Sequence, residues 1–433
     1  MNTPPYHALV IALGSSGDLH PMLAIAGELQ QRGRRVTFFV NEHFAPIPRR
    51  FGLTCTVMGS ADEYSRVTLN PDLWHPTRGG ATVMQQAVVP SLRQTIDLIA
   101  QHVAEGPTVV VSTPVAMGAR IARDKFAMPL ASINFAPIAY LSVAHPPRMP
   151  TGQISPKLPM WMKRSIFSLI ERWMTDPMIA PDLNALRAEM GLSPVRNVFT
   201  RWWQSPDLTI SMFPKWFAAP APDWPAHHTQ AGFHLFDERE QTQTLPENID
   251  AFLRAGPAPI VFTPGSAMRF GQRFFSTAVE AVHVLGRRAI FLTRYPEQLP
   301  PSLPRTVAHF DYVPLSLLLP RCAALVSHGG IGTVAQGLAA GIPQVVMAMA
   351  HDQFDNAARL EALRVGSMLR REKFSTSRLV KILSKLLNDP EMPSRCADLK
   401  ARFNPARDIA SACDAIDDLA QRSFGHLKPH PIS

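Results

Sequence analysis

The sequence predicts an α/β protein with two Rossmann-like, strand–turn–helix domains that face each other across a cleft. Short apolar runs that end in glycine turns and continue into helical patterns occur in both halves of the chain. A polar stretch at residues 236–250 separates the halves and is interpreted as a linker. With 433 residues, the chain is long enough for two domains with separate cores. Strands that alternate with helices indicate parallel sheets, which bind ligands at the carboxyl ends of their strands.

The N-terminal domain, residues 1–235, opens with a predicted strand at residues 8–13. Pro21 is expected in the first turn of the helix that follows, where its missing N–H costs nothing. Further strands are predicted at 36–40, 108–112 and 130–134, with helical runs at 82–102 and 115–126. The turn after the first strand should line the cleft. That turn contains Gly14, Ser15, Ser16 and Gly17.

Two side chains beside this turn are candidates for a general base at the mouth of the cleft. Asp18 offers a carboxylate, although Asp is also a common N-cap residue of helices. His20 could act as a base or could be a packed histidine. The residue pattern leaves the choice between them open.

An insertion at residues 137–225 is rich in proline and tryptophan. Within it, residues 159–173 form an amphipathic pattern. Its apolar residues, broadly on one side, are Trp161, Ile166, Leu169, Ile170 and Trp173. We expect this helix to pack on the N-terminal domain through that side. In a second interpretation, the insertion walls an apolar acceptor pocket or rests on a membrane.

The C-terminal domain, residues 251–404, repeats the strand–turn–helix pattern. A strand at 259–263 runs into Gly265 and Ser266, and further strands are predicted at 289–292 and 307–310. A strand at 323–326 then leads through a glycine turn into a helix near residue 331. Bare N–H groups at such a helix start suit a phosphate, and His328 and Thr333 can add donors.

After the next strand, at 345–347, the polar run His351, Asp352 and Gln353 can hydrogen-bond several hydroxyl groups. Residues 405–433 are expected to form a C-terminal helix that packs back across the cleft, and a tail. Phosphate-binding and hydroxyl-binding groups therefore follow each other within one βαβ unit.

The composition indicates which classes of ligand are expected and in which cellular compartment the protein works. A net charge of +9 favours anionic ligands, but no dense Lys/Arg run with interleaved aromatics points to nucleic acid. The four cysteines are far apart in sequence and suggest neither a zinc site nor a disulfide framework. No apolar run approaches the length of a membrane span, so we expect a cytoplasmic protein. Peripheral contact with the inner membrane is left open.

Three motifs together resemble a known family. His328-x-Gly330-x-x-Thr333, Gly341-x-Pro343 and Asp352-Gln353-x-x-Asn356 resemble the donor-binding signature of GT-B, inverting nucleotide-sugar glycosyltransferases of family 1. Gly14-Ser15-x-Gly17-Asp18-x-x-Pro21 resembles the acceptor-side signature of bacterial and sterol members. Central motifs such as Trp74-x-Pro76 and Asp223-Trp-Pro225 are similar to one subfamily, the rhamnosyltransferase B subunits of rhamnolipid synthesis.

The resemblance implies a role for each matched residue. Asp18 would be the catalytic base, and the donor would be held without a metal ion or another cofactor. Val313 would meet the base of the nucleotide, and Asp352 and Gln353 would hold sugar hydroxyls. Fixed dipoles would stabilise the leaving diphosphate. The donor loops that would hold the diphosphate comprise Gly265, Ser266, His328, Gly330, Gly332 and Thr333.

The subfamily implies dTDP-L-rhamnose as donor and an apolar hydroxy-fatty-acid dimer, a 3-(3-hydroxyalkanoyloxy)alkanoate, as acceptor. Gln336 replaces a glutamate that in many relatives binds both ribose hydroxyls, which is compatible with a deoxyribose. Alternatives are another apolar acceptor (sterol, carotenoid or polyketide) with UDP-glucose or another donor, a sugar-nucleotide 2-epimerase, and a non-catalytic nucleotide-sugar binder. The need for a partner that synthesises the acceptor is left open.

Overall fold

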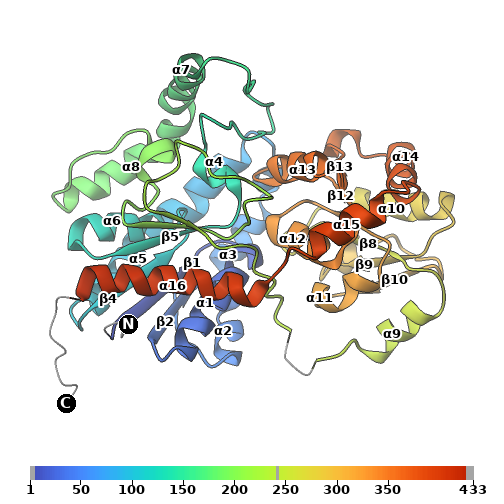
Figure 1. Ribbon diagram of the computed structural model, residues 1–433, viewed down its shortest axis with the longest axis horizontal. Coiled ribbons are helices and arrows are strands. Elements are labelled where there is room, and N and C mark those ends of the chain that lie inside the picture. The colour runs from blue at the N-terminus through green and yellow to red at the C-terminus, as the bar shows by residue number, and fades with distance from the viewer. Residues whose placement is uncertain (1–4, 240–242, 426–433) are drawn as a thin grey trace.

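The computed structural model describes residues 5–239 and 243–425 and confirms two α/β domains, each built on one parallel sheet (Figure 1). The N-terminal sheet has the order β3-β2-β1-β4-β5-β6-β7, and the C-terminal sheet has the order β10-β9-β8-β11-β12-β13. Every strand pair in both sheets is parallel. In both sheets the strand order reverses beside the first strand of the domain, which places a topological switch point there.

The N-terminal sheet is covered by helices on both faces. Buried apolar residues of β1, β2, β4 and β5 fill the space between the sheet and these helices. The strands are β1 His7–Ala12, β2 Arg35–Val40, β3 Thr54–Val57, β4 Thr108–Ser112, β5 Leu130–Asn134, β6 Leu208–Ser211 and β7 His228–Gln230. The helices are α1 Ser16–Gln31, α2 Pro46–Arg50, α3 Ala61–Leu69, α4 Gly79–Val83, α5 Val89–Val103, α6 Met117–Phe126, α7 Met160–Ile170 and α8 Asp176–Glu189.

The C-terminal domain is smaller. One apolar cluster lies within it, and a second, around β8, β9 and β11, continues into the N-terminal domain through residues such as Trp74 and Phe233. Its strands are β8 Ile260–Thr263, β9 Ala289–Leu292, β10 Val307–Phe310, β11 Ala324–Ser327, β12 Gln344–Val346 and β13 Gly366–Met368. Its helices are α9 Glu247–Arg254, α10 Gln272–Val284, α11 Leu315–Leu318, α12 Ile331–Ala340, α13 Gln353–Ala362, α14 Thr376–Leu387 and α15 Met392–Lys400.

The last helix, α16 Pro405–Phe424, leaves the C-terminal domain and packs against α1 and beside β6 and β7 of the N-terminal domain (Figure 1). Tyr6 donates a hydrogen bond to Asp417 at 3.0 Å, and Arg32 bonds both Asp414 and Asp417. The end of the chain is thereby tied to its beginning. The predicted tail at 426–433 and part of the predicted linker, 240–242, lie outside the described residues.

The predicted position of Pro21 was wrong. Helix α1 begins at Ser16, so Pro21 lies inside the helix rather than in its first turn. Ser15 is the N-cap, and it forms a capping box with Asp18 that satisfies two N–H groups of the first turn. This local bonding starts the helix earlier than the proline suggested. Asp18 is therefore the third residue of the helix and not its N-cap.

The predicted orientation of the helix at 159–173 was wrong for three of its five apolar side chains, whereas Ile166 and Ile170 are half-buried. Trp161, Leu169 and Trp173 point to solvent, while Lys163 and Phe167 of α7 are buried. Residues 171–175 continue α7 as a π-helical turn.

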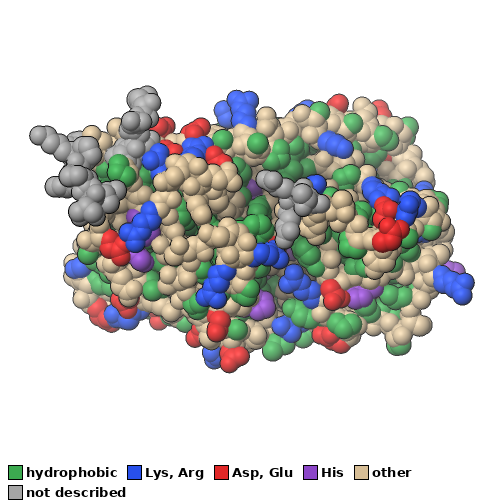
Figure 2. Space-filling view, turned by 90° about the horizontal axis from the view of Figure 1, so that it is seen from below, with side chains coloured by type: hydrophobic (Ala, Val, Ile, Leu, Met, Phe, Trp, Pro, Cys, Tyr) green, Lys and Arg blue, Asp and Glu red, His purple; other side chains and the backbone are tan. Residues whose placement is uncertain are grey.

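Two further features concern the surface. On the lower face of the molecule, acidic and basic side chains are interspersed (Figure 2). Among the helices of residues 5–239 and 243–425, none has the length and apolar content to cross a bilayer.

Candidate active site

A cleft of about 1580 Å³ lies between the two domains and is lined by residues of both. Its walls include loops that follow β1 and β4 in one sheet and β8 and β11 in the other. These are the strands on either side of each switch point, where the loops diverge and leave a crevice. Two switch points that face each other therefore create the cleft.

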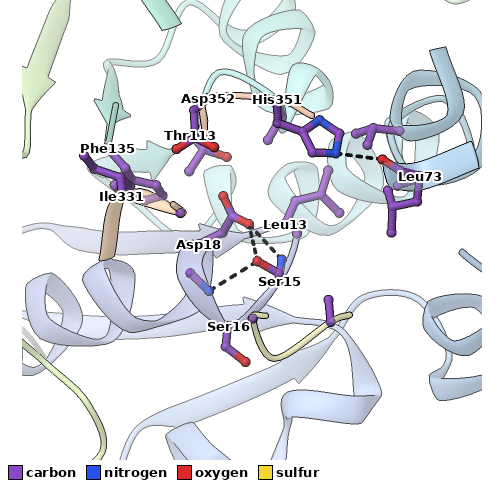
Figure 3. A pocket seen from close by; sticks show the side chains of 18 of the residues that line it. Leu13, Ser15, Ser16, Asp18, Leu73, Thr113, Phe135, Ile331, His351 and Asp352 are labelled. Carbon is purple, nitrogen blue, oxygen red and sulfur yellow. Dashed lines mark hydrogen bonds between the residues drawn. The ribbon is translucent and has the colours of Figure 1, made fainter. Parts of the chain in front are cut away.

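Asp18 stands at the N-terminal wall of this cleft (Figure 3). Its Oδ2 accepts hydrogen bonds from the Ser15 N–H at 2.7 Å and from the Ser15 hydroxyl at 3.2 Å. A Cβ at position 14 would lie 2.2 Å from Oδ2, and Gly14 has φ +134°, so glycine is required there. The capping box and the glycine turn thus hold one carboxylate oxygen and leave the other facing the cleft.

The environment of Asp18 changes its acidity. Burial raises the pKa of Asp18 to about 6, and the hydrogen bonds from Ser15 oppose this rise. A carboxylate with a pKa near 6 is a stronger base than an ordinary one and is still ionised at neutral pH. The local geometry therefore suits proton abstraction.

Asp352 faces the same space from the C-terminal domain (Figure 3). Asn356 donates to its Oδ2 at 2.7 Å, and the same amide group donates to the Gly329 carbonyl at 3.0 Å. Burial raises the pKa of Asp352 to about 6, with a further contribution from the charge of Asp18. The Asp18 carboxylate is thus close enough to raise the pKa of a carboxylate in the opposite domain.

The donor-side loops predicted from the sequence come together around His328. A Cβ at position 265 would lie 2.8 Å from the imidazole ring, and one at position 330 would lie 2.6 Å from its Nε2. Gly265 and Gly330 therefore permit the two loops to close on the ring. The ring is also edge-on to Trp74 of the N-terminal domain, at 6.3 Å between centroids.

His328 is neutral in this setting. Burial, with a smaller contribution from His351, lowers the pKa of His328 to about 4. Its Nδ1 is buried and has no hydrogen-bond partner among the described residues. A neutral imidazole with an unused nitrogen can offer one hydrogen bond to a ligand.

Helix α12 begins directly beyond this loop, with Gly330 as N-cap and no side chain capping its first N–H groups. A Cβ at Gly332 would meet no atom within 4 Å, so the backbone is open to the cleft there. Uncapped N–H groups and the positive end of the helix dipole favour an anion at this point. Three other predicted donor-binding residues line the cleft: Ser266, Val313 and Thr333.

Gln353 and His351 form hydrogen bonds within the protein, which limit the atoms that each can offer to a ligand. The Oε1 of Gln353 accepts from the Met349 and Ala350 N–H groups, at 2.8 and 3.1 Å, which leaves its amide NH₂ for a ligand. His351 was expected among the hydroxyl-binding groups, but its Nε2 bonds the Leu73 carbonyl at 2.9 Å and joins the two domains instead.

Gln336, the residue found where many relatives of the resembled family carry a glutamate, also lines the cleft. Its Nε2 donates to the Leu235 carbonyl at 3.0 Å.

His20 also lines the cleft. Its Nε2 lies 3.0 Å from Glu238 Oε1, and Glu238 additionally bonds Arg50 at 2.8 Å. A histidine held by a carboxylate can accept a proton, so the geometry does not remove His20 from consideration. Asp18 and His20 thus both remain candidates for the base.

Thr113 was missed by the sequence analysis. It follows β4 at the switch point, lies beside Asp352 in the close-up view (Figure 3), and its buried hydroxyl has no partner among the described residues. The predicted strand at 108–112 places Thr113 at the cleft edge, so this signal was available. The sequence pointed to Trp74 only as part of a motif. Its contact with His328 is visible only in the tertiary structure.

One group among the described residues could hold a metal ion: His7, His102 and Glu105. His7 begins β1, whereas Asp18 follows the other end of that strand, so this group is remote from the cleft. Metal independence of the cleft stays a prediction.

Comparisons with known proteins agree with this geometry. Residues 290–412 match the family model of the erythromycin biosynthesis protein CIII-like C-terminal domain. The chain is 26% identical to an uncharacterized glycosyltransferase of Mycobacterium tuberculosis, over 96% of this chain and 99% of the relative. It is also 26% identical to the O-mycaminosyltylonolide 6-deoxyallosyltransferase of Streptomyces fradiae, over 96% and 98%.

Solved structures show the same fold over nearly the full length. The glycosyltransferase of kitacinnamycin superposes with a TM-score of 0.74 at 22% identity, covering 96% of this chain and 99% of that one. The glycosyltransferase VinC in complex with dTDP superposes with a TM-score of 0.70 at 18% identity, covering 96% and 100%. The chain has the GT-B fold, and it resembles glycosyltransferases in sequence over almost its whole length. The matched family region contains His328, α12 and Asp352, which form the C-terminal wall of the cleft.

Proposed function

We propose that the protein transfers L-rhamnose from dTDP-L-rhamnose to the hydroxyl group of a 3-(3-hydroxyalkanoyloxy)alkanoate, with inversion and without a metal ion, giving mono-rhamnolipid. The observation that carries the proposal is the shared cleft. A carboxylate of raised pKa, Asp18, and an uncapped helix N-terminus that suits a diphosphate line it from opposite domains. The base and the site for the leaving group thus lie on opposite sides of one space, which is the arrangement that an in-line displacement requires.

The proposed step is a single displacement. The acceptor oxygen forms a bond to the anomeric carbon while the bond from that carbon to the diphosphate oxygen breaks. Asp18 takes the hydroxyl proton, and the electron pair of the broken bond leaves on dTDP. The N–H groups at the start of α12 and the His328 side chain stabilise the charge that develops there.

The acceptor half rests on the apolar part of the cleft. Several apolar side chains of the N-terminal domain line the cleft, and such a lining suits acyl chains. Such an acceptor partitions into bilayers, so we place the reaction at a membrane surface in the cytoplasm. This apolar wall includes Val83, Met84, Leu141, Ile170, Phe199 and Trp203.

The proposal is tested by mass spectrometry of the products of the purified protein. It is offered dTDP-L-rhamnose and UDP-glucose in competition, with hydroxyacyl dimers as acceptors. A product mass equal to acceptor plus deoxyhexose supports the proposal. Addition of a hexose, or no product with any lipid, contradicts it.

A second candidate is transfer to a polyketide or macrolide acceptor. The observation that favours it is the likeness to the Streptomyces fradiae enzyme, whose name describes transfer of a deoxy sugar to a tylonolide. The same apolar wall would accommodate a flat or macrocyclic acceptor. Product formation with macrolactones but not with hydroxyacyl dimers would decide for this candidate.

The rate of transfer is expected to fall as pH decreases below about 6. Asp18 must be ionised to accept a proton, and its pKa is raised to about 6, so protonation removes the base below that value. The decline in kcat/KM should approach tenfold per pH unit, and become steeper where Asp352 also protonates. A pH profile from 4.5 to 8.5 measures this. A flat profile across pH 6 would contradict the assignment of Asp18 as base.

The donor nucleotide is expected to be dTDP in preference to UDP. Gln336 occupies the position where a glutamate would accept bonds from both ribose hydroxyls, and its amide N–H already bonds Leu235. A deoxyribose has no 2′-hydroxyl that needs such an acceptor. Titration calorimetry should give a lower Kd for dTDP than for UDP. The Gln336→Glu variant should bring the Kd values for the two nucleotides closer together. Equal affinities in the unaltered protein would contradict this prediction.

A further inference from the structure

Helix α7 exposes an unusual concentration of large apolar side chains. Trp161 is 68% exposed, Trp173 69%, Met174 60% and Leu169 58%. They lie on α7 or on the π-helical turn that continues it. In Figure 1, α7 lies at the outer edge of the N-terminal domain, away from both sheets. Exposed apolar side chains gathered on one element mark an interaction surface rather than ordinary scatter.

The inner side of the same helix is mixed, because the buried Phe167 lies there together with buried polar side chains. The buried Lys163 donates from Nζ to the Ala144 carbonyl at 3.1 Å, and Glu171 is buried and accepts from the Thr200 N–H at 2.9 Å. The helix therefore attaches to the protein partly through polar groups and turns its tryptophans outward. An amphipathic helix whose outer side meets only water would carry polar residues there instead of tryptophans.

Between positions 157 and 175, the exposed charged side chains are all positive. Lys157, Arg164 and Arg172 are exposed, whereas the one acidic residue between positions 157 and 175, Glu171, is buried. The Arg172 guanidinium lies over the Trp173 ring at 5.5 Å from its centroid. Tryptophan combined with arginine and lysine is typical of elements at the interface of an anionic bilayer. The mixed charges of the face in Figure 2 lack this bias.

The exposed surface is continuous with the cleft. Ile170 and Met174 line the cleft, and Met149 of the neighbouring loop both lines it and is 37% exposed. One side of α7 and its continuation therefore faces the space assigned to the acceptor, and the other side faces outward. An apolar molecule would pass along this helix on its way to the cleft.

We propose that α7 is a docking element that binds the surface of an anionic lipid bilayer and holds the mouth of the acceptor cleft against it. Trp161, Leu169 and Trp173 enter the interface, and Arg164 and Arg172 pair with anionic headgroups. The inference deepens the proposed function, since it names the source from which a lipid acceptor enters. A bilayer fits the surface better than a second copy of the chain, because two copies would bring like charges together.

The test is co-sedimentation of the full chain with vesicles, without any substrate. Vesicles of phosphatidylcholine with 30 mol% phosphatidylglycerol are compared with vesicles of phosphatidylcholine alone. We expect binding to the anionic vesicles, weakened by 0.5 M salt. The double variant Trp161→Ser/Trp173→Ser should lower the partition coefficient at least tenfold, and Arg164→Ala/Arg172→Ala should remove the preference for anionic vesicles. Val284→Ser, which alters a 64% exposed side chain on α10, is the matched control and should bind normally.

Several results would overturn the inference. These are absence of binding by the unaltered protein, equal binding to both vesicle types, or full binding by the tryptophan variant. A dimer that the tryptophan variant abolishes in size-exclusion chromatography would assign the surface to self-association. Binding of α7 to a protein partner in the absence of vesicles would assign it to that partner.

Transfer to a short-chain, micelle-free acceptor separates this inference from the proposed function. If the tryptophan variant loses vesicle binding but keeps that activity, docking is separate from catalysis, as we propose. If the unaltered protein binds vesicles but uses no hydroxyacyl acceptor, the docking element stands and the proposed acceptor fails.

Discussion

Asp18→Asn is expected to lower kcat by roughly 100- to 10,000-fold while the affinity for dTDP stays unchanged. Asparagine cannot take the proton of the acceptor hydroxyl at neutral pH. Its carbonyl oxygen can still accept the hydrogen bond that Ser15 N–H gives to Asp18, at 2.7 Å, so the start of α1 is preserved. The donor loops lie in the other domain, and the hydrogen bonds given for Asp18 are with Ser15. Steady-state kinetics and calorimetry with dTDP together measure the two quantities.

Two companion variants make the result specific. Asp97→Asn alters an exposed carboxylate on α5 and should leave both quantities unchanged. His20→Ala removes the rival base but leaves the Ser15–Asp18 capping box intact. If Asp18→Asn retained substantial activity and His20→Ala lost it, the base would be His20, held by Glu238.

His328→Ala is expected to raise the Kd for dTDP about 10- to 100-fold, which corresponds to the loss of about 1–3 kcal/mol for a hydrogen bond to a charged group. The imidazole is neutral and has an unused nitrogen, so it can donate to a diphosphate oxygen without a counter-charge. Gly265 and Gly330 also close on its ring, so its removal leaves a void between the two loops. Both effects weaken the same site.

Calorimetry with dTDP provides the measurement, and thermal unfolding checks that the variant is folded. His283→Ala on α10 removes an exposed histidine from the same domain and should not change the affinity. Unchanged binding of dTDP by a folded His328→Ala protein would contradict the role of His328 at the diphosphate.

Much of the fold follows from local pattern. The strands predicted at 108–112, 130–134, 289–292 and 307–310 have the observed bounds, because each is a short apolar run between turn residues. The short strands β3, β6, β7 and β13 were not predicted, and each has only three or four residues. Their pairing depends on a sheet that is already formed.

The candidate site divides in a similar way. Gly14, Asp18, His328 and Gly330 follow predicted strands, and parallel strands place such residues at one edge of a sheet. The tie between His351 and Leu73, 278 residues apart, has no local signature. The charge interaction between Asp18 and Asp352 also has no local signature. It acts between the two domains and helps to raise the pKa of Asp352.

The start of α1 and the orientation of α7 show why local pattern was insufficient. Ser15 and Asp18 form a reciprocal hydrogen-bonded cap that outweighed the positional preference of Pro21. Periodicity showed that α7 has an apolar side but not whether that side meets protein or solvent. The buried contacts of Lys163 and Glu171 settle this, and they involve residues distant in sequence. Local pattern therefore established the strands and the chemistry of the loops, because both depend on neighbouring residues. The cleft, the acidity of its carboxylates and the outward tryptophans depend on contacts between distant segments, which only the folded chain creates.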